Sequence, residues 1–222
     1  MSTSTSGAAA YQRLREAIVR VELAPGSPVS EAQLVERFGF TKAAVRAALA
    51  RLRAEGLVLA EARRGHVVAP LTMRDVLEIY DLRLALEPAA AEAAAGAMDG
   101  AELKRLHELA DPQFEVEDAR AVERFLAANR AIHLAIVAAA GNQRAAGIIE
   151  RLLDDSERAR ILALRAGAAG SGRRARTELH AVLDAIGEGD GPRARELMAE
   201  AIRVFRDELV ERLQSAALDR PL

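Results

Sequence analysis

Apolar positions recur at helical spacing along most of this chain, and the pattern changes character near residue 70. Before that point, three short amphipathic segments begin near Tyr11, Ser30 and Thr41. Two short apolar runs follow, at residues 57–59 and 66–68, and each is typical of a strand. Beyond these runs the spacing is helical throughout. We therefore predict three helices and a hairpin, followed by an all-helical region.

Local signals mark the ends of the second and third predicted helices. Ser30, followed three residues later by Gln33, is a capping box that opens one helix. Thr41 is a suitable N-cap for the next helix, and Gly39 lies in the short turn between the two. Two helices joined by such a turn form the layout that places the second helix in the major groove of DNA.

The predicted helix over residues 41–55 has an apolar face and a basic face. Its apolar residues are Val45, Ala48, Leu49 and Leu52. Lys42 and Arg46 are four residues apart and lie together on the opposite face. Two more arginines add positive charge, and no acidic residue occurs in this helix before Glu55. This arrangement predicts binding to duplex DNA.

The rest of the chain reads as about six helices, so the fold class is mainly α. The expected helices lie near residues 72–95, 101–109, 118–140, 143–164, 173–187 and 192–213. Pro88 should kink or restart the first of them. We predict a disordered lead over residues 1–10, a winged helix-turn-helix DNA-binding domain over residues 11–70, and an all-helical bundle over residues 71–222.

Charge is divided unevenly between the two parts, although the net charge is only −2. Residues 1–70 hold ten Lys/Arg and six Asp/Glu, whereas the remainder holds 21 and 27. A basic front favours contact with nucleic acid. The chain has no cysteine, which excludes disulfides and cysteine catalysis. No apolar run approaches the roughly 18 residues of a membrane span, and no secretory signal is visible. We therefore expect a cytoplasmic protein with no membrane partner.

Short motifs occur at characteristic spacing along nearly the whole chain. In the first domain they are Pro-Gly at 25–26, Ser-Glu-x-x-Leu at 30–34, Val-Arg-x-Ala-Leu at 45–49 and Glu-Gly-Leu at 55–57. In the second they are the runs YDLRLALEPAAAEAAA, HLAIVAAAGN and LDAIGEGD. The first set resembles the winged-helix domain of GntR-type transcription regulators, and the second resembles the FCD domain of the FadR-like branch. The resemblance implies a homodimeric DNA-binding regulator, not an enzyme, controlled by a small organic or sugar acid. It also implies that the helical domain over residues 71–222 binds this effector and dimerises.

The resemblance also implies which residues contact DNA. The family's recognition helix usually begins with Ser-Arg or Thr-Arg, but here the pair is Thr41-Lys42, and Lys lacks the fork that Arg presents to guanine. Arg46 matches the family's helix arginine and is the expected base contact, whereas Thr41 is expected at phosphate. The residues around Gly65 match the tip of the wing, near the minor groove. The complete expected set is Thr41, Lys42, Arg46, Arg51, Arg63, Arg64, Gly65 and His66.

Arg83 matches an arginine in the family's Arg-x-x-Leu-Glu run. Its guanidinium is expected to hold the carboxylate of an effector in the helical domain. The alternative is an ion pair with Glu87, which a spacing of four residues permits. Arg130 and Arg160 are further candidates for the same cavity, but periodicity does not decide where they face. The expected effector contacts are Arg83, Asn129 and His133.

Many FCD domains bind a divalent metal through Asp or Asn, a His four residues later, and two further His. Asn129 and His133 match the first pair. Leu179 and Ala201 stand where the resemblance places the other two imidazoles, so we expect no metal cofactor. The alternative is a weakly bound divalent metal held by Asn129, His133 and His180, if the helix is shifted.

These expectations describe a homodimeric repressor that binds an inverted-repeat operator in double-stranded DNA and is released by a small carboxylate effector. Two other classes stay open. One is an architectural DNA-binding dimer whose effector pocket is vestigial. The other is a metal-dependent hydrolase; the sequence speaks against it, because it has neither a paired-histidine motif with a general-base Glu nor a nucleophile elbow.

Overall fold

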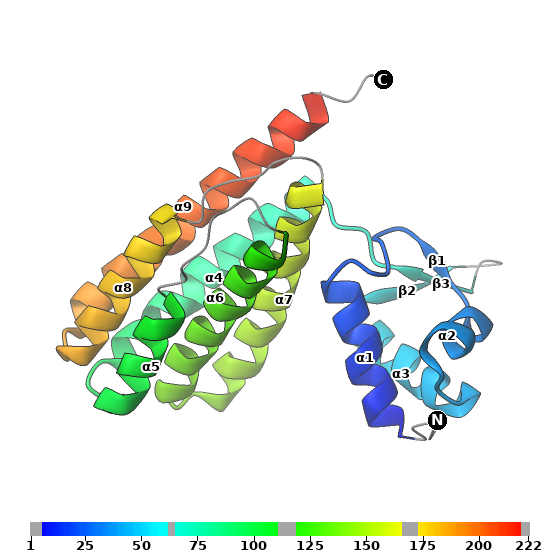
Figure 1. Ribbon diagram of the computed structural model, residues 1–222, viewed down its shortest axis with the longest axis horizontal. Helices are drawn as coiled ribbons and strands as arrows, with labels where there is room; N and C mark the ends of the chain where they lie inside the picture. Colours follow the sequence, from blue (N-terminus) through cyan, green and yellow to red (C-terminus); the bar gives the residue numbers. More distant parts are fainter. Residues whose placement is uncertain (1–5, 62–64, 111–118, 166–172, 219–222) are drawn as a thin grey trace. The chain divides into compact units, whose positions relative to one another are not determined.

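The computed structural model describes residues 6–61, 65–110, 119–165 and 173–218. Within these ranges the chain forms nine helices and one three-stranded sheet (Figure 1). The chain divides into two compact units, residues 1–72 and 73–222. The predicted fold class, a winged helix-turn-helix followed by an all-helical bundle, is confirmed.

The first unit contains three helices and three short strands. These are α1 (Gly7–Val19), β1 (Pro28–Val29), α2 (Glu31–Phe38), α3 (Lys42–Ala54), β2 (Val58–Glu61) and β3 (Gly65–Val68). Strand β3 lies between the other two and pairs antiparallel with both. Strands β2 and β3 form the predicted hairpin. Strand β1 has no counterpart among the predicted strands, because two residues after a Pro-Gly turn carry no alternation to detect.

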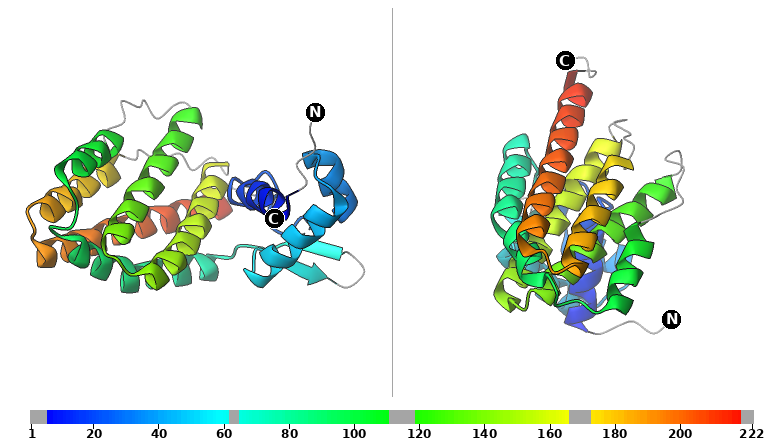
Figure 2. Two further views of the ribbon diagram at one scale, coloured as in Figure 1. Left: turned by 90° about the horizontal axis from the view of Figure 1, so that it is seen from below. Right: turned by 90° about the vertical axis from the view of Figure 1, so that its left-hand side faces the viewer.

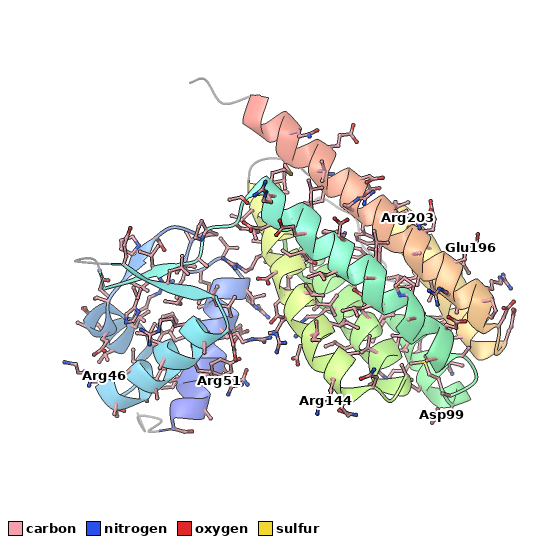
Figure 3. All side chains as sticks on the ribbon, turned by 180° about the vertical axis from the view of Figure 1, so that it is seen from behind. Arg46, Arg51, Asp99, Arg144, Glu196 and Arg203 are labelled. Atoms are coloured by element: carbon pink, nitrogen blue, oxygen red, sulfur yellow. The ribbon has the colours of Figure 1, made fainter. Side chains whose placement is uncertain are left out.

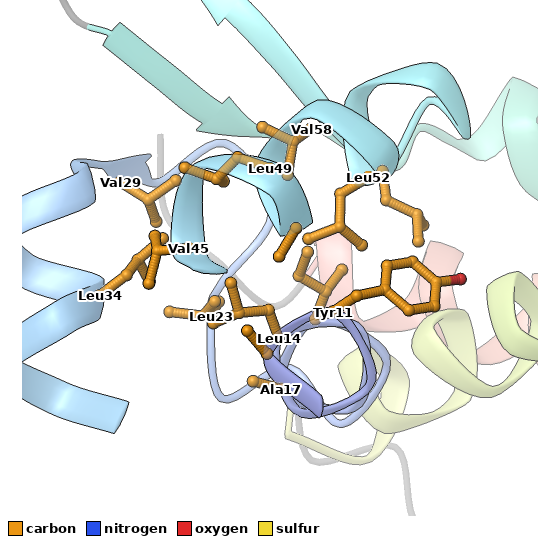
Figure 4. Close-up of a cluster of buried hydrophobic side chains, with 14 of the residues drawn as sticks. Tyr11, Leu14, Ala17, Leu23, Val29, Leu34, Val45, Leu49, Leu52 and Val58 are labelled. Carbon is orange, nitrogen blue, oxygen red and sulfur yellow. The ribbon is translucent and has the colours of Figure 1, made fainter. Parts of the chain in front are cut away.

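A single apolar core holds the first unit together (Figure 4). Side chains from the three helices and the sheet converge on it, and Leu14, Val45 and Leu52 are completely buried. Burial of each such leucine contributes roughly 1.5–3 kcal/mol. All four residues of the predicted apolar face of α3 are buried. Because one face of α3 is committed to this core, its other face lies in solvent.

Capping interactions fix the turn between α2 and α3. The Ser30 hydroxyl accepts from the Gln33 amide at 3.2 Å, and the Ser30 amide donates to Oε1 of Gln33 at 3.1 Å, which confirms the capping box. The Thr41 hydroxyl oxygen accepts from the Ala44 amide at 3.2 Å. Gly39 ends α2 with a φ of 71°, a left-handed conformation that favours glycine. The direction of α3 is therefore set by its first residues.

Helix α1 begins earlier than the periodicity predicts. It starts at Gly7, so residues 7–10, assigned above to the lead, are helical, and Ala10 is completely buried in the core. Alanine favours the helical conformation, and the burial of Ala10 in the core stabilises the first turn of α1. The helix ends at Val19 because Val21 adopts a φ of 57°, outside the helical region.

The second unit is a bundle of six helices, as predicted (Figure 2). They are α4 (Met73–Ala94), α5 (Gly100–Ala110), α6 (Ala119–Ala139), α7 (Gln143–Arg165), α8 (Arg173–Gly187) and α9 (Gly191–Leu218). Helix α4 is central and packs on α6, α7, α8 and α9, while α6 also packs on α7. Across the described segments, no helix combines the length and the apolar character that crossing a bilayer requires.

Pro88 does not restart helix α4, which is continuous from Met73 to Ala94. Proline removes one backbone hydrogen bond and disfavours the helix interior. Here Pro88 and the flanking Glu87, Ala90 and Ala91 are all buried against neighbouring helices. Packing on both sides of the proline therefore holds the helix together and keeps Arg83 and Glu87 on one continuous face.

Candidate DNA-binding surface and effector site

The exposed face of α3 carries the predicted base contact. Arg46 projects from α3 into solvent (Figure 3), and its side chain is 66% exposed. Lys42, one turn earlier on the same face, is also exposed. The geometry confirms the division of this helix into a buried apolar face and an exposed basic face. A helix presented in this way is able to enter the major groove.

Arg46 is not isolated on this surface, because it forms a bidentate ion pair with Glu31 at the start of α2. Its Nε donates to Oε1 of Glu31 at 3.0 Å and its Nη2 donates to Oε2 at 3.0 Å. The hydrogen bond from Arg46 lowers the pKa of Glu31, and the charges of Arg46, Lys42 and His66 act in the same direction. In the sequence, Glu31 belongs to the Ser-Glu-x-x-Leu motif, but its ion pair with Arg46 was not predicted, since a pair 15 residues apart on two helices leaves no periodic signal.

The wing adds a second edge to this surface. Gly65 begins β3 with a φ of 80°, and His66 pairs across the sheet with Val29 on one side and Ala60 on the other. The charge of His66 reaches Glu31, so the wing and the helices share one electrostatic surface. The predicted wing-tip residues Arg63 and Arg64 lie outside the described residues.

Arg51 has a partner within its own unit. Its guanidinium lies 3.6 Å from the centre of the Tyr11 ring, and its Nε donates to Oε1 of Glu55 at 3.1 Å. The Tyr11 hydroxyl donates to the same carboxylate. This cluster ties α1 to the end of α3, but the Arg51 side chain is still 57% exposed, so its contact with DNA stays a prediction.

In the helical unit, Arg83 forms the ion pair that the sequence left as an alternative. Its Nε donates to Oε1 of Glu87 at 2.5 Å, and its Nη1 donates to the Ser156 hydroxyl at 3.3 Å. Glu87 also accepts from Nδ1 of His133. Burial alone raises the pKa of Glu87, but the charges of Arg83 and His133 outweigh it and lower that pKa to about 2. Arg83, Glu87 and His133 thus form one buried network.

A small hollow beside this network brings together residues of α4, α6 and α7. It is lined by Arg83, Leu126, Asn129, Arg130, Leu153, Ser156, Glu157 and Arg160. Its space is about 250 Å³, counted with its open mouth. Of the two arginines that periodicity left undecided, both face this hollow. Arg130 pairs with Asp154 at 2.9 Å.

Arg160 differs from the other two arginines of the hollow, because no carboxylate of the described residues forms an ion pair with it. Its guanidinium lies 3.7 Å from the centre of the Phe205 ring. Burial lowers the pKa of Arg160, and the nearby positive charge of Arg83 acts in the same direction. Tyr80, through its charge and a hydrogen bond, and the charge of Glu208 only partly offset this lowering. Nearby, Oδ1 of Asn129 is buried and has no hydrogen-bond partner within the described part. The hollow therefore offers a cation and an acceptor.

The residues present do not fit a divalent metal. Leu179 and Ala201, the positions at which the resemblance places imidazoles, are both 1% exposed and apolar. His180 has its Nδ1 2.9 Å from Nδ1 of His107 and is engaged there. No cluster of three His, Cys, Asp or Glu side chains suited to a metal ion occurs among the residues described. Asn129 and His133 alone are too few ligands for a stable transition-metal site.

A basic helix-turn-helix with a wing, carried on a helical bundle with its own polar hollow, defines the class of two-domain DNA-binding regulators. Family models agree with this class over both units. Residues 7–68 match the model described as bacterial regulatory proteins, gntR family, and residues 78–204 match the FCD domain. The chain belongs to the GntR family of transcription regulators and carries an FCD domain.

Individual relatives are regulators as well. The chain is 29% identical over 153 residues to the uncharacterized HTH-type transcriptional regulator YdhC of Bacillus subtilis, covering 68% of each. It is 28% identical over 152 residues to the HTH-type transcriptional repressor RspR of Escherichia coli, covering 68% of this chain and 67% of RspR. The structure of Escherichia coli McbR/YncC matches with a TM-score of 0.81 at 22% identity, over 95% of this chain and all of that one, which supports the fold. The family is one of regulators, which removes the hydrolase alternative.

Proposed function

We propose that this DNA-binding regulator is a repressor, released from its operator by a small hydroxy acid that binds in the hollow of the FCD domain. The names of two relatives, the repressors RspR and GlaR of Escherichia coli, support the direction of regulation. We further propose that it acts as a homodimer on an inverted repeat, because a two-fold dimer presents its recognition helices to mirrored half-sites.

The guanidinium of Arg160, which has no carboxylate partner among the described residues, is the observation that carries the effector proposal. A cation held away from water without a counter-ion is costly, and a carboxylate offsets that cost through charge-assisted hydrogen bonds. Arg83 and Arg130 already have carboxylate partners in Glu87 and Asp154. The acid group of the effector is therefore assigned to Arg160 rather than to Arg83.

Asn129 specifies a second feature of the effector. Its Oδ1 is buried without a partner, and an unpaired buried acceptor is also costly. A hydroxyl next to the carboxylate would donate to this oxygen while the acid group meets Arg160. The hollow is small, which favours a compact ligand. Lactate, glycerate and small sugar acids have this combination of groups.

Arg83 and His133 support the hollow through Glu87. The network holds the Arg83 side chain in the wall of the hollow, where its positive charge adds to that of Arg160. His133 holds the other oxygen of the same carboxylate. We propose that these two residues act on the effector by keeping the wall of the hollow fixed.

A thermal-shift series tests the effector proposal. Lactate, glycerate and gluconate are compared with acetate, which lacks the hydroxyl, and with lactamide, which lacks the charge. We expect the hydroxy acids to raise the melting temperature and to release operator DNA. Arg160→Gln should lose both effects, while the matched change Arg144→Gln, at an exposed position of the same helix, should retain them.

The result also separates this proposal from the architectural alternative. If no acid shifts the melting temperature or the operator affinity of the wild-type protein, the pocket is vestigial and the effector proposal is wrong. If acids act equally on wild type and Arg160→Gln, an effector exists but binds elsewhere. Arg160→Lys controls for folding, because it keeps the charge and the length of the side chain while losing the fork.

A further inference from the structure

Glu31 places a carboxylate inside the basic DNA-binding surface. It begins α2, and the positive charges that act on it come from Arg46 and Lys42 on α3 and from His66 on the wing. An acid at this position opposes contact with phosphate, which is the main source of affinity for any DNA sequence. Its presence therefore needs an explanation other than affinity.

Stability supplies only a small part of that explanation, because an acid in the first turn of α2 gains only a weak favourable interaction with the helix dipole. The Arg46–Glu31 pair is exposed, with side-chain exposures of 66% and 25%. Exposed ion pairs contribute little to folding, because water screens them and ordering two side chains costs entropy. The core beneath this surface is made of apolar side chains from other positions, such as Leu34 and Val45. The geometry of the pair is more informative than its energy.

Glu31 engages only one edge of the Arg46 guanidinium. Nε and Nη2 donate to the two carboxylate oxygens, both at 3.0 Å. The opposite edge, formed by Nη1 and the second hydrogen of Nη2, has no partner among the residues described. A guanidinium held along its side edge keeps its end edge directed outward. Guanine presents two acceptors, O6 and N7, that match such an edge.

We propose that Glu31 is a positioning residue that determines the base specificity of Arg46. It fixes the guanidinium so that its end edge meets guanine, and its negative charge weakens contact with phosphate elsewhere. Both effects raise the ratio of specific to non-specific binding. The inference rests on the proposed base contact of Arg46, and it adds a residue that the DNA-contacting set of the sequence analysis lacks.

The test compares two duplexes, the operator selected in vitro with the wild-type protein and a shuffled duplex of the same composition. We expect Glu31→Ala to lower the ratio of the two affinities about tenfold, within the range of a bidentate base contact. Binding to the shuffled duplex should rise about threefold, because one repulsive charge is removed. Glu36→Gln is the matched control on the same helix, exposed in solvent, and should change the ratio less than about twofold.

A double-mutant cycle makes the test specific to positioning. In an Arg46→Ala background, Glu31→Ala should have no further effect on the ratio. An equal loss of affinity for both duplexes, or an unchanged ratio in Glu31→Ala, overturns the inference. If Arg46→Ala itself keeps the operator preference, the base contact of Arg46 is wrong and the inference falls with it. If only Arg46→Ala removes the preference, the base contact stands and the role of Glu31 alone is rejected.

Discussion

The two units of this protein each contain a bidentate arginine–glutamate pair, and the two pairs lie in opposite surroundings. In the DNA-binding unit, the side chains of Arg46 and Glu31 are 66% and 25% exposed. In the FCD unit, those of Arg83 and Glu87 are 4% and 1% exposed, and His133 joins them. Both pairs use Nε and Nη2 of the arginine. The two pairs use the same atoms, so their different burial accounts for their different roles.

An exposed pair is adjustable, because water replaces either partner at little cost. Arg46 is therefore able to turn from Glu31 toward DNA, or to read a base while still held. A buried pair has no such substitute, and removal of one partner leaves a charge without compensation. Arg83 is consequently part of the buried framework of the FCD unit. We propose that ligand binding falls to Arg160, which takes no part in the Arg83–Glu87–His133 network.

The largest expected effect comes from breaking the buried pair. Glu87→Gln keeps the shape of the side chain but leaves Arg83 without its counter-ion, and we expect the free energy of unfolding to fall by about 3–5 kcal/mol. Denaturant unfolding followed by circular dichroism measures this loss. Glu31→Gln, the equivalent change in the exposed pair, should leave the unfolding free energy of the DNA-binding unit unchanged.

A second variant keeps this prediction testable if Glu87→Gln does not fold. Arg83→Met combined with Glu87→Leu removes both charges and should recover much of the lost stability, because apolar replacements avoid the cost of burying ions. A loss below about 1 kcal/mol in Glu87→Gln would instead mean that the buried pair is no more important than a surface pair.

Acid should distinguish the two pairs as well. The pKa of Glu87 is about 2 in the folded protein, below its ordinary value of 4.5. Folding therefore favours its charged form, and this contribution is complete above about pH 4.5 and is lost as the pH falls toward 2. The difference corresponds to about 3 kcal/mol. Urea unfolding at several pH values between about 5 and 2 should show this loss of unfolding free energy in wild type. The unfolding free energy of Glu87→Gln should change less over the same pH range.

The exposed pair provides the control for this pH profile. Glu31→Gln should follow the wild-type profile, because its carboxylate is exposed and interacts in water. Identical profiles for wild type and Glu87→Gln would contradict the assignment of acid sensitivity to the buried network.

The elements of both units were accessible from sequence because their signals are local. The Ser30 capping box, the Thr41 N-cap and the apolar face of α3 each depend on residues within four positions of one another. The six helices of the bundle follow from the same periodicity. The start of α1 and strand β1 were missed, because burial of Ala10 and pairing with β3 depend on residues far away in the chain.

The site residues also divide into those with a local sequence signal and those whose contacts join distant parts of the chain. The Arg83–Glu87 pair was open to sequence reasoning as an i,i+4 spacing, although spacing did not decide between an ion pair and a ligand contact. The roles of Glu31, Arg51 and Arg160 depend on contacts between separate helices. Glu31 meets Arg46 across 15 residues, and Arg51 meets Tyr11 between α3 and α1. Arg160 stands out only because the structure gives carboxylates to Arg83 and Arg130.

Changes on the exposed surface should affect DNA binding without affecting folding. We expect Arg46→Ala to reduce operator preference by about ten- to a hundredfold, because a bidentate base contact discriminates between sequences. Lys42→Ala should weaken binding to all duplexes and reduce the salt dependence by about one charge. Lys42→Arg should bind at least as tightly as wild type. Fluorescence anisotropy at several salt concentrations separates the two behaviours, and equal effects of both alanine variants would contradict them.

The smallest expected effect is that of chelation. Metal would bridge helices of the FCD unit if the family's full ligand set were present, but Leu179 and Ala201 are buried and apolar where two imidazoles are needed. The buried Arg83–Glu87–His133 network links α4 and α6 through hydrogen bonds and needs no metal ion to do so. We therefore expect EDTA to leave the melting temperature unchanged within about a degree, since nothing that stabilises the folded state is removed. Elemental analysis after dialysis should find much less than one metal per chain. About one zinc or nickel per chain would show that His133 and Asn129 have a further ligand, and His180 would then have to leave His107 to provide it.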